Sequence, residues 1–384
     1  MSTALNSSAT LPEVIALPPP RRIGYDARFS LGEYRGMGRY LRRLIQPVQA
    51  QSIGFVADGD SDPELRIRAR GFRFFPLWEQ LSLPRRAQEA CAEFLIAPYN
   101  TAPLHTPHGL KLILVLHDFI YLRSTSELPL SRSAYQNFGR LYRRWNVPRA
   151  VHRAHRIICV SEYTRQELLR RFRVDANKVC VIPNTVDASW FRLESTRSNE
   201  NENYVLCVSG EAPNKNLDRA LHGFAEYCRI ARDKTTRLKV AGVKRAHQAA
   251  FVKIASQLSI VDRVMFLDYL PYEDLQLLYA GARAFFFPSR DEGFGIPVLE
   301  ALAAGVPVIS SNAASLPEVA GEVALYFHPD SVSGMGEQLS AVLTNPQLQV
   351  TMSHRSRERA ARFHPRAVDA MIAQFWEKTL GADA

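Results

Sequence analysis

Short apolar runs alternate with helix-like segments along most of this chain. The runs are typical of buried strands, because they are rich in Val, Ile, Leu and Phe and end at Gly, Pro or polar residues. They lie in segments 21–29, 52–58, 92–98, 111–118, 156–160 and 178–184 of the first half, and in segments 204–210, 237–243, 263–270, 283–289, 306–310 and 324–327 of the second. Strands that alternate with helices predict parallel sheets with helices on both faces.

A polar segment, LESTRSNENEN at residues 193–203, separates the two alternating halves. We therefore predict an α/β chain of two Rossmann-like parallel-sheet domains that face each other across a cleft. The predicted parts are a disordered tail at 1–20, an N-terminal domain at 21–192, a linker at 193–203, a C-terminal domain at 204–364, and a helix at 365–384 that packs back on the N-terminal domain.

The composition is that of a globular protein, with 46% hydrophobic and 22% charged residues. The sequence contains no run of about 18 apolar residues, so we expect no transmembrane helix. Residues 1–20 are too short and too interrupted by an acid for a secretion signal. The five cysteines form no CxxC pair, which favours a reducing cytoplasm and supports neither a disulfide framework nor a zinc site.

Residues 291–310 (DEGFGIPVLEALAAGVPVIS) place two carboxylates around a glycine-rich turn. Glu292 falls on the loop after a strand, and Glu300 falls in the helix that Pro297 opens. The loop Gly293–Ile296 leaves backbone N–H groups free at a helix N-terminus, where anions bind. Carboxylates accept hydrogen bonds from sugar hydroxyls, so a nucleotide-sugar fits the pattern. The alternative is a helix cap, with Glu292 favoured by the helix dipole and Glu300 solvated.

Other strand ends carry further candidates, because ligands of such folds bind at the carboxyl ends of strands. Lys215 follows a strand and a proline turn, which suits a diphosphate clamp, although a lysine near a turn is commonly just solvated. His117 ends a buried strand, where a histidine is more often structural. The remaining candidates at strand ends and turns are Gly36, Met37, Gly38, Asp118, Gly210, Asn216, Asp268 and Tyr269.

Several ordered motifs resemble those of the retaining glycosyltransferases of family 4, which have the GT-B fold. EGFGIPVLE at residues 292–300 looks like the E-x7-E signature of that family, and residues 270–329 follow the family pattern almost continuously. Similar matches are DARFSLGEYRGMGRYLRRL (26–44), LVLHD (114–118), CVSEYTRQELLRRF (159–172), VIPNTVD (181–187) and GEAPNKNLDRAL (210–221). The resemblance covers residues 22–375 and extends to mannosyltransferases of bacterial surface polysaccharide synthesis.

The resemblance implies a role for each matching residue. In the catalytic set, Glu292 would contact the transferred sugar, Lys215 would neutralise the leaving diphosphate, and His117 would lie near the reacting carbon. Asp118 would join His117 on the acceptor side, and Glu300 would hold the ribose. The other donor-binding residues would be Gly36, Met37, Gly38, Gly210, Asn216, Asp268, Tyr269, Gly293, Phe294, Gly295 and Ile296.

The chemistry that the resemblance implies is sugar transfer with retention at the anomeric carbon, without a metal ion or another cofactor. A cationic, oxocarbenium-like sugar would form as the diphosphate leaves, and positive charge would stabilise the leaving group. The resemblance favours mannose or a related hexose from a GDP-sugar, passed to a glycan or lipid-linked acceptor. The alternatives are a UDP- or ADP-sugar donor and a sugar-nucleotide-binding protein without turnover.

Some positions depart from the family pattern. The lysine-bearing loop lacks the arginine and the RKN triplet that family members often carry, so a second cation, Arg290 or Arg219, is expected at the diphosphate. Near the nucleotide base, Asp268 replaces a usual glycine, and Thr185 replaces the glycine of a PNG motif. These departures leave the base preference open.

The net charge of +10 is concentrated between Arg132 and Arg173, where eleven arginines accompany two acids. We expect this region to contact phosphates, either of a lipid-diphosphate-linked acceptor or of an anionic surface on the inner face of the cytoplasmic membrane. A solvated face is the alternative, and no recognition motif supports nucleic acid. The residues expected at that surface are Tyr135, Phe138, Arg140, Tyr142, Arg143, Arg144 and Trp145.

Overall fold

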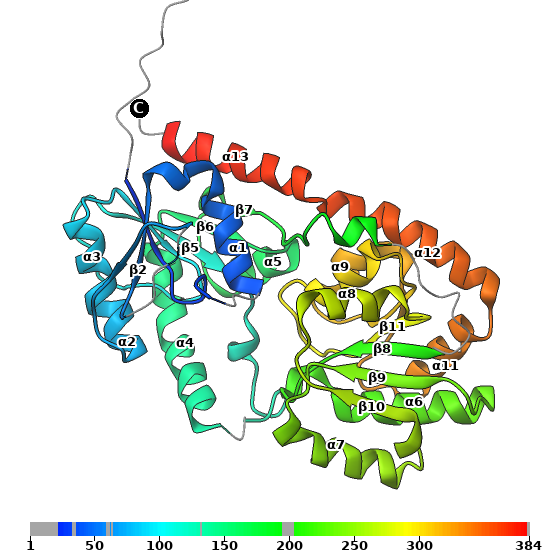
Figure 1. The fold of residues 1–384 in the computed structure, drawn as a ribbon. Coiled ribbons are helices and arrows are strands. Elements are labelled where there is room, and N and C mark those ends of the chain that lie inside the picture. Colours follow the sequence, from blue (N-terminus) through cyan, green and yellow to red (C-terminus); the bar gives the residue numbers. More distant parts are fainter. Residues whose placement is uncertain are drawn as a thin grey trace, which may run out of the picture.

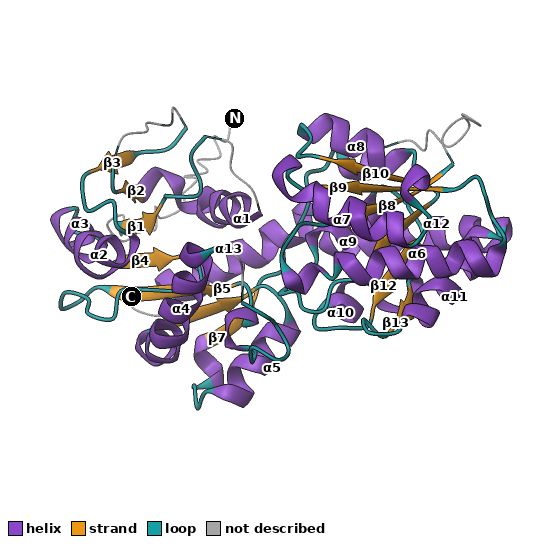
Figure 2. Cartoon of the chain, turned by 90° about the horizontal axis from the view of Figure 1, so that it is seen from below, coloured by secondary structure: helices purple, strands orange, loops and turns teal. Residues whose placement is uncertain are grey.

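The computed structural model describes residues 22–32, 36–58, 62, 64–130, 133–193 and 203–381. The predicted tail at 1–20, Arg132 and nearly all of the predicted linker lie outside these residues. Two parallel sheets stand side by side, each between layers of helices (Figures 1 and 2). The predicted α/β architecture is therefore confirmed.

The N-terminal sheet has seven strands in the order β3-β2-β1-β4-β5-β6-β7, all paired in parallel. The strands are β1 (Ile23–Asp26), β2 (Ser52–Val56), β3 (Ile67–Ala69), β4 (Phe94–Ala97), β5 (Lys111–Leu116), β6 (Arg156–Cys159) and β7 (Val179–Val181). The helices are α1 (Gly36–Ile45), α2 (Phe75–Leu77), α3 (Leu83–Glu89), α4 (Ala134–Arg153) and α5 (Glu162–Arg171). The strand order reverses between β1 and β4, which opens a crevice at their carboxyl ends.

The C-terminal sheet has six parallel strands in the order β10-β9-β8-β11-β12-β13. The strands are β8 (Tyr204–Val208), β9 (Arg237–Ala241), β10 (Val264–Leu267), β11 (Ala284–Phe287), β12 (Val308–Ser311) and β13 (Leu325–Phe327). The helices are α6 (Leu217–Ala231), α7 (Arg245–Gln257), α8 (Tyr272–Ala280), α9 (Ile296–Ala303), α10 (Leu316–Ala320), α11 (Val332–Leu343), α12 (Pro346–Ala360) and α13 (Pro365–Gly381).

Alternate residues of the central strands enter different cores, because successive side chains of a strand point to opposite faces of the sheet. In β11, Ala284 and Phe286 pack in a core that also contains residues of α6 and α11. Phe285 and Phe287 instead join a core that continues into the N-terminal domain, where it includes Ile113 of β5. The two domains are therefore held together by apolar packing as well as by the chain between them.

Helix α13 connects the two domains a second time. Figure 1 shows it running from the C-terminal domain across the N-terminal domain, near α1. The Trp376 side chain is 3% exposed, and its Nε1–H donates to the carbonyl oxygen of Leu44 over 2.7 Å. Val368, Ile372 and Phe375 lie in the same shared core. The end of the chain therefore returns to the N-terminal domain.

We predict that Trp376→Ala lowers the free energy of unfolding by about 3–5 kcal/mol, because it leaves a cavity in the shared core. Trp376→Phe should cost less, since it keeps most of the ring and loses mainly the hydrogen bond, worth about 1 kcal/mol. Urea denaturation followed by circular dichroism measures both, with the exposed neighbour Glu377→Ala as control. A loss in Trp376→Ala no larger than in the control would contradict this role of α13.

Candidate active site between the domains

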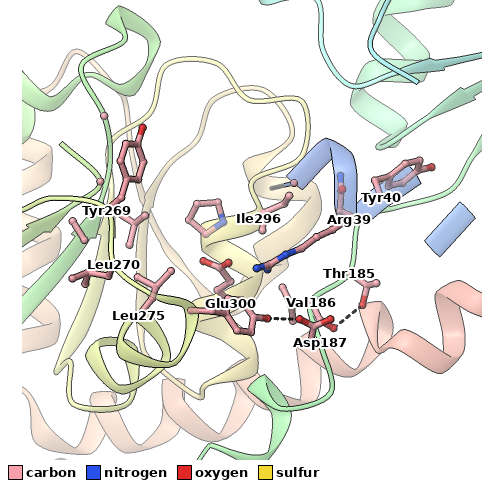
Figure 3. A pocket seen from close by; sticks show the side chains of 18 of the residues that line it. Arg39, Tyr40, Thr185, Val186, Asp187, Tyr269, Leu270, Leu275, Ile296 and Glu300 are labelled. Carbon is pink, nitrogen blue, oxygen red and sulfur yellow. Dashed lines mark hydrogen bonds between the residues drawn. The ribbon is translucent and has the colours of Figure 1, made fainter. Parts of the chain in front are cut away.

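A cavity of about 1200 Å³ lies between the two sheets. Figure 3 shows side chains from both domains around it, among them Arg39 and Tyr40 of α1 and Glu300 of α9. The predicted donor-binding residues that line the cavity are Gly36, Gly210, Lys215, Tyr269, Ile296 and Glu300. The structure thus has a cavity where the sequence predicted a cleft between the domains.

Two helix N-termini face each other at this cavity. Helix α9 begins at Ile296, after Gly295 with its φ of +100°, a backbone conformation that favours glycine. Helix α1 begins at Gly36, where an added Cβ would lie 3.2 Å from Cδ1 of Ile296. Free N–H groups and helix dipoles at two N-termini attract an anion such as a diphosphate.

Lys215 and Glu292 form an ion pair beside the cavity. Their Nζ and Oε1 atoms are 2.7 Å apart, and the hydroxyl of Ser289 donates to the same Oε1 over 2.7 Å. Lys215 ends the short 3-10 helix Pro213–Lys215, which Asn216 closes in the left-handed conformation at φ 58°. This ion pair puts a cation and a carboxylate side by side, and such groups can bind phosphates and hydroxyls respectively.

Glu300 is buried and accepts a hydrogen bond of 2.9 Å from the hydroxyl of Tyr279. Burial raises the pKa of Glu300 to about 7, while the Tyr279 hydroxyl and the charge of Arg39 act in the opposite direction. The guanidinium of Arg39 lies 4.1 Å from the ring centroid of Tyr272. Arg39 and Tyr272 were not predicted from the sequence, because only the facing of the domains brings α1 next to α8.

His117 and Asp118 lie where β5 ends, and His117 is buried while Asp118 is half-buried. Nε2 of His117 lies 2.8 Å from the carbonyl oxygen of Pro98, and burial lowers the pKa of His117 to about 4. The ring is therefore neutral near pH 7, with its proton on Nε2 facing the carbonyl, so that Nδ1 can accept a hydrogen bond. Burial raises the pKa of Asp118, whose Oδ1 accepts from the Ile120 N–H over 3.1 Å.

Other predicted donor residues do not line the large cavity among the residues that the structure describes. The Asn216 amide is buried and donates to the carbonyl oxygens of Pro288 and Pro329, so it fastens two loops together. Asp268 accepts from the N–H of Tyr269 over 2.7 Å. The remaining residues of this group are Met37, Gly38, Gly293, Phe294 and Gly295.

Arg290 and Arg219, the two candidates for a second cation beside Lys215, both lie next to an acid instead. Arg290 lies 2.7 Å and Arg219 3.5 Å from Oδ1 of Asp330, and neither lines the cavity. Arginines from α1, Arg39 and Arg43, line it in their place. The sequence could not show this, because the two arginines lie on the opposite domain.

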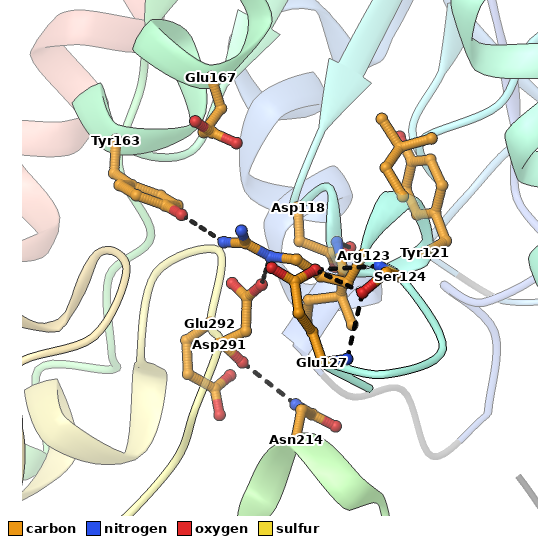
Figure 4. Close-up of polar contacts among 12 residues, drawn as sticks. Asp118, Tyr121, Arg123, Ser124, Glu127, Tyr163, Glu167, Asn214, Asp291 and Glu292 are labelled. Carbon is orange, nitrogen blue, oxygen red and sulfur yellow. Dashed lines mark hydrogen bonds and ion pairs between the residues drawn. The ribbon is translucent and has the colours of Figure 1, made fainter. Parts of the chain in front are cut away.

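A second set of polar contacts joins the domains near Glu292 (Figure 4). Arg123, which follows β5, donates to Oδ2 of Asp291 over 2.6 Å and to the hydroxyl of Tyr163 over 2.8 Å. Together with His117, Asp118 and the Glu292 loop, these residues surround the place where the two domains touch. Asp291 belongs to the glycine-rich stretch in which Glu292 was predicted as a site residue, but nothing in the sequence indicated that Arg123 would be the partner of Asp291.

Comparison with known proteins agrees with this architecture. The family model for Glycosyltransferase Family 4 matches residues 34–190, and the model for Glycosyl transferases group 1 matches residues 189–359. The chain belongs to these glycosyltransferases, and its two facing domains form the GT-B fold, as the sequence motifs predicted.

Curated relatives include the O-antigen chain mannosyltransferase RfbU of Salmonella typhimurium, which is 32% identical over 50% of this chain and 52% of its own length. The O-antigen chain mannosyltransferase B of Escherichia coli is 26% identical over 73% of this chain and 74% of its own length. The matched part of this chain thus spans about half of the first relative.

Solved structures share the fold. WaaG, a glycosyltransferase involved in lipopolysaccharide biosynthesis, superposes with a TM-score of 0.71 at 17% identity, over 91% of this chain and 99% of WaaG. Anabaena HepE in complex with UDP-glucose gives a TM-score of 0.72 at 16% identity, over 93% and 99%. Within the described residues, none of the helices has the length and apolarity of a membrane span.

We predict that Glu300 makes the protein less stable as the pH rises. The carboxyl loses its proton near its ordinary pKa of 4.5 in the unfolded chain, but burial raises the pKa to about 7 in the folded protein. Between these values the folded state binds more protons, so the free energy of unfolding falls with increasing pH. Glu300→Gln lacks this dependence.

Urea denaturation of both proteins at several pH values from about 5 to about 8 measures the effect. Wild type should lose stability relative to Glu300→Gln over this range. A difference between the two proteins that stays constant with pH would mean that Glu300 titrates as an ordinary carboxyl.

Proposed function

We propose that this protein is a retaining hexosyltransferase that moves mannose, or a related hexose, from a GDP-sugar to a glycan or lipid-diphosphate-linked acceptor. The observation that carries the proposal is the Lys215–Glu292 ion pair beside two facing helix N-termini in an interdomain cavity. The O-antigen mannosyltransferase relatives favour mannose as the sugar.

In this proposal, the nucleoside diphosphate lies between the N-termini of α1 and α9, with Glu300 toward the ribose and Lys215 toward the phosphates. As the bond from the anomeric carbon to the diphosphate oxygen breaks, negative charge grows on that oxygen, and the N–H groups and Lys215 stabilise it. Glu292 holds hydroxyls of the sugar while its ring becomes cationic.

The acceptor hydroxyl attacks from the same face as the leaving diphosphate, which takes its proton, so the anomeric configuration is retained. Nδ1 of the neutral His117 is available on the acceptor side to accept a hydrogen bond, and Asp118 lies next to it. Because Lys215 and two helix N-termini supply the positive charge at the diphosphate, we propose that the reaction needs no metal ion.

A UDP-sugar is the second candidate donor, because a solved structure of similar fold holds UDP-glucose. A binding protein without turnover is a weaker alternative. A pocket that only bound the donor would have no need of His117 and Asp118, which the proposal assigns to the acceptor side.

We predict transfer from a GDP-sugar in excess chelator, with Lys215→Ala losing on the order of 2–4 kcal/mol of transition-state stabilisation. Glu292→Ala should lower turnover, and Glu300→Ala should mainly weaken nucleotide binding. A thermal-shift panel of GDP, UDP and ADP identifies the base, since a ligand of the folded state raises the melting temperature. Radiolabelled transfer then measures kcat and KM.

The exposed Lys253→Ala on α7 serves as the matched control. Turnover of Lys215→Ala within threefold of wild type would refute the role of the lysine. Complete loss of transfer in chelator, with recovery on adding magnesium or manganese, would refute the metal-independent mechanism. No stabilisation by any nucleotide would refute the donor site.

We further propose that an apolar and basic face of the N-terminal domain docks on an anionic membrane that carries the acceptor. Phe74, next to α2, contacts Phe138 of α4 with ring centroids 5.9 Å apart, and both side chains are exposed. Residues 66–77 contain four arginines, α4 contains five, and neither segment contains an acid. The exposed apolar residues of this face are Phe72, Phe74, Leu77, Leu81, Tyr135, Phe138, Leu141 and Trp145.

The face differs from the one predicted from the sequence. Arg140 donates to the carbonyl oxygens of Leu128 and Arg123 over 2.9 and 2.6 Å, so it supports a loop and is not free to meet phosphates. Tyr142 is buried, and its hydroxyl donates to Glu79 over 2.7 Å. The expectation that Tyr142 belongs to the surface was therefore wrong, and the half-buried Arg140 is held by carbonyl oxygens.

We predict that wild type cosediments with phosphatidylglycerol vesicles at low salt and that a Phe74→Ser, Phe138→Ser, Leu141→Ser triple variant binds at least about tenfold more weakly. Each apolar side chain that leaves water for the interface is worth roughly 1.5–3 kcal/mol when fully buried. Salt should weaken wild-type binding by screening the arginines.

Leu277→Ser with Val350→Ser, two exposed residues of the C-terminal domain, is the control. The membrane-docking proposal would be refuted if wild type did not bind anionic vesicles at low salt, or if the triple variant bound as well as wild type. Neither result would contradict the proposed sugar transfer.

A further inference from the structure

Arg123 connects the N-terminal domain to the loop that carries Glu292. Its Nε–H donates to Oδ2 of Asp291 over 2.6 Å, and its Nη2 donates to the hydroxyl of Tyr163 over 2.8 Å. The side chain of Arg123 is 27% exposed and that of Asp291 9% exposed. Figure 4 shows the guanidinium between Tyr163 and Asp291, with Glu292 next to Asp291. A shielded ion pair of this kind is stronger than a surface pair.

Further hydrogen bonds tie the same loop to helix α5. The hydroxyl of Ser161 donates to the carbonyl oxygen of Gly293 over 2.6 Å, and that of Thr164 to the same oxygen over 3.2 Å. In return, Glu318 of α10 accepts from the backbone N–H groups of Glu162 and Tyr163 over 2.7 and 2.8 Å. These contacts all cross from one domain to the other.

On its own domain the loop is held from the other side. The Asn214 amide donates to the carbonyl oxygen of Asp291 over 3.1 Å, and the Arg290 N–H donates to the carbonyl oxygen of Asn214 over 2.7 Å. The residue before Glu292 is thus held by its backbone in the C-terminal domain and by its carboxylate in the N-terminal domain. Its position depends on both domains at once.

The charges around Asp291 make its partner necessary. Burial raises the pKa of Asp291 to about 6, the charge of Arg123 opposes this, and the neighbouring Asp118 and Glu292 raise it further. Tyr163 and Glu167 of α5 face Arg123, and Arg143 of α4 acts on Asp118. Four carboxylates, those of Asp118, Glu167, Asp291 and Glu292, therefore lie at this contact, and Arg123 bonds directly to Asp291.

We propose that Arg123 is a positioning residue for catalysis: by holding Asp291, it fixes the Glu292 loop against the N-terminal domain in the arrangement that brings donor and acceptor sites together. This inference rests on the proposed glycosyl transfer. Since Arg123 does not line the donor cavity, its loss should affect turnover far more than nucleotide binding. A displacement of about 1 Å in a positioned group can cost on the order of a hundredfold in rate.

The test uses Arg123→Met, Arg123→Lys and Asp291→Asn in the full chain, with the nucleoside diphosphate that stabilises wild type most as the binding probe. Arg123→Met should lower kcat about ten- to a hundredfold while the affinity for the nucleotide stays within threefold. Arg123→Lys should recover part of kcat. The double variant Arg123→Met, Asp291→Asn should lose no more than the worse single variant, because both remove one interaction.

The pH profile separates positioning from a general effect on folding. In wild type, kcat should fall below about pH 6, where Asp291 gains a proton and the ion pair is lost. In Arg123→Met there is no ion pair left to lose, so this fall should be absent from its pH profile. Arg165→Met removes the partner of Glu162 on the same helix without touching the loop, and should leave kcat and the profile unchanged.

Hydrogen exchange at residues 290–294 provides a readout that does not depend on turnover, and it should be faster in Arg123→Met than in wild type and in Arg165→Met. If wild type transfers no sugar from any donor, the proposed function fails, while exchange still decides whether Arg123 holds the loop. If wild type transfers sugar and Arg123→Met keeps its kcat and its slow exchange, the inference fails alone.

Discussion

The arrangement of the two domains depends on one close approach of their backbones, where Gly293 lies against the end of β5. A Cβ atom added to Gly293 would fall 1.6 Å from the carbonyl oxygen of His117. Any side chain at this position would push the domains apart. Because the contact is that tight, the N-termini of α9 and α1 meet at one cavity, and the loop of Glu292 lies beside it.

The charges near this contact follow from its burial. Glu300 and Asp291 are buried, and the loss of water raises the pKa of each. Each acid is served by a cation from the other domain: the charge of Arg39 acts on Glu300, and Arg123 bonds to Asp291. Arg39 and Arg123 favour the charged forms of these acids against the effect of burial, which links the chemistry of the site to the packing of α1 and of the segment after β5.

Much of the fold could be predicted because its signals are local. Phe285 and Phe286 belong to a run that is apolar at every position, as a strand with helices on both faces requires. The segment from β3 to α3 was not predicted, because it has no such local signal. Strand Ile67–Ala69 has exposed or half-buried side chains and includes Arg68. The π-helical turn Trp78–Ser82 follows no regular hydrophobic period. Edge strands and irregular helices bury too little to leave a pattern.

The sequence by itself determined the two parallel sheets, the glycine-rich turn before α9, and the carboxylates and lysine that stand at strand ends, because hydrophobic period, helix caps and turn residues act over a few neighbours. Only the tertiary structure decided which charges meet. Arg123 binds Asp291 although the two residues are 168 positions apart in the chain. Arg290 is the direct neighbour of Asp291 in the sequence, yet it forms an ion pair with Asp330. Partners so distant are chosen by the shape of the packed domains, and that shape depends on all of the core contacts together.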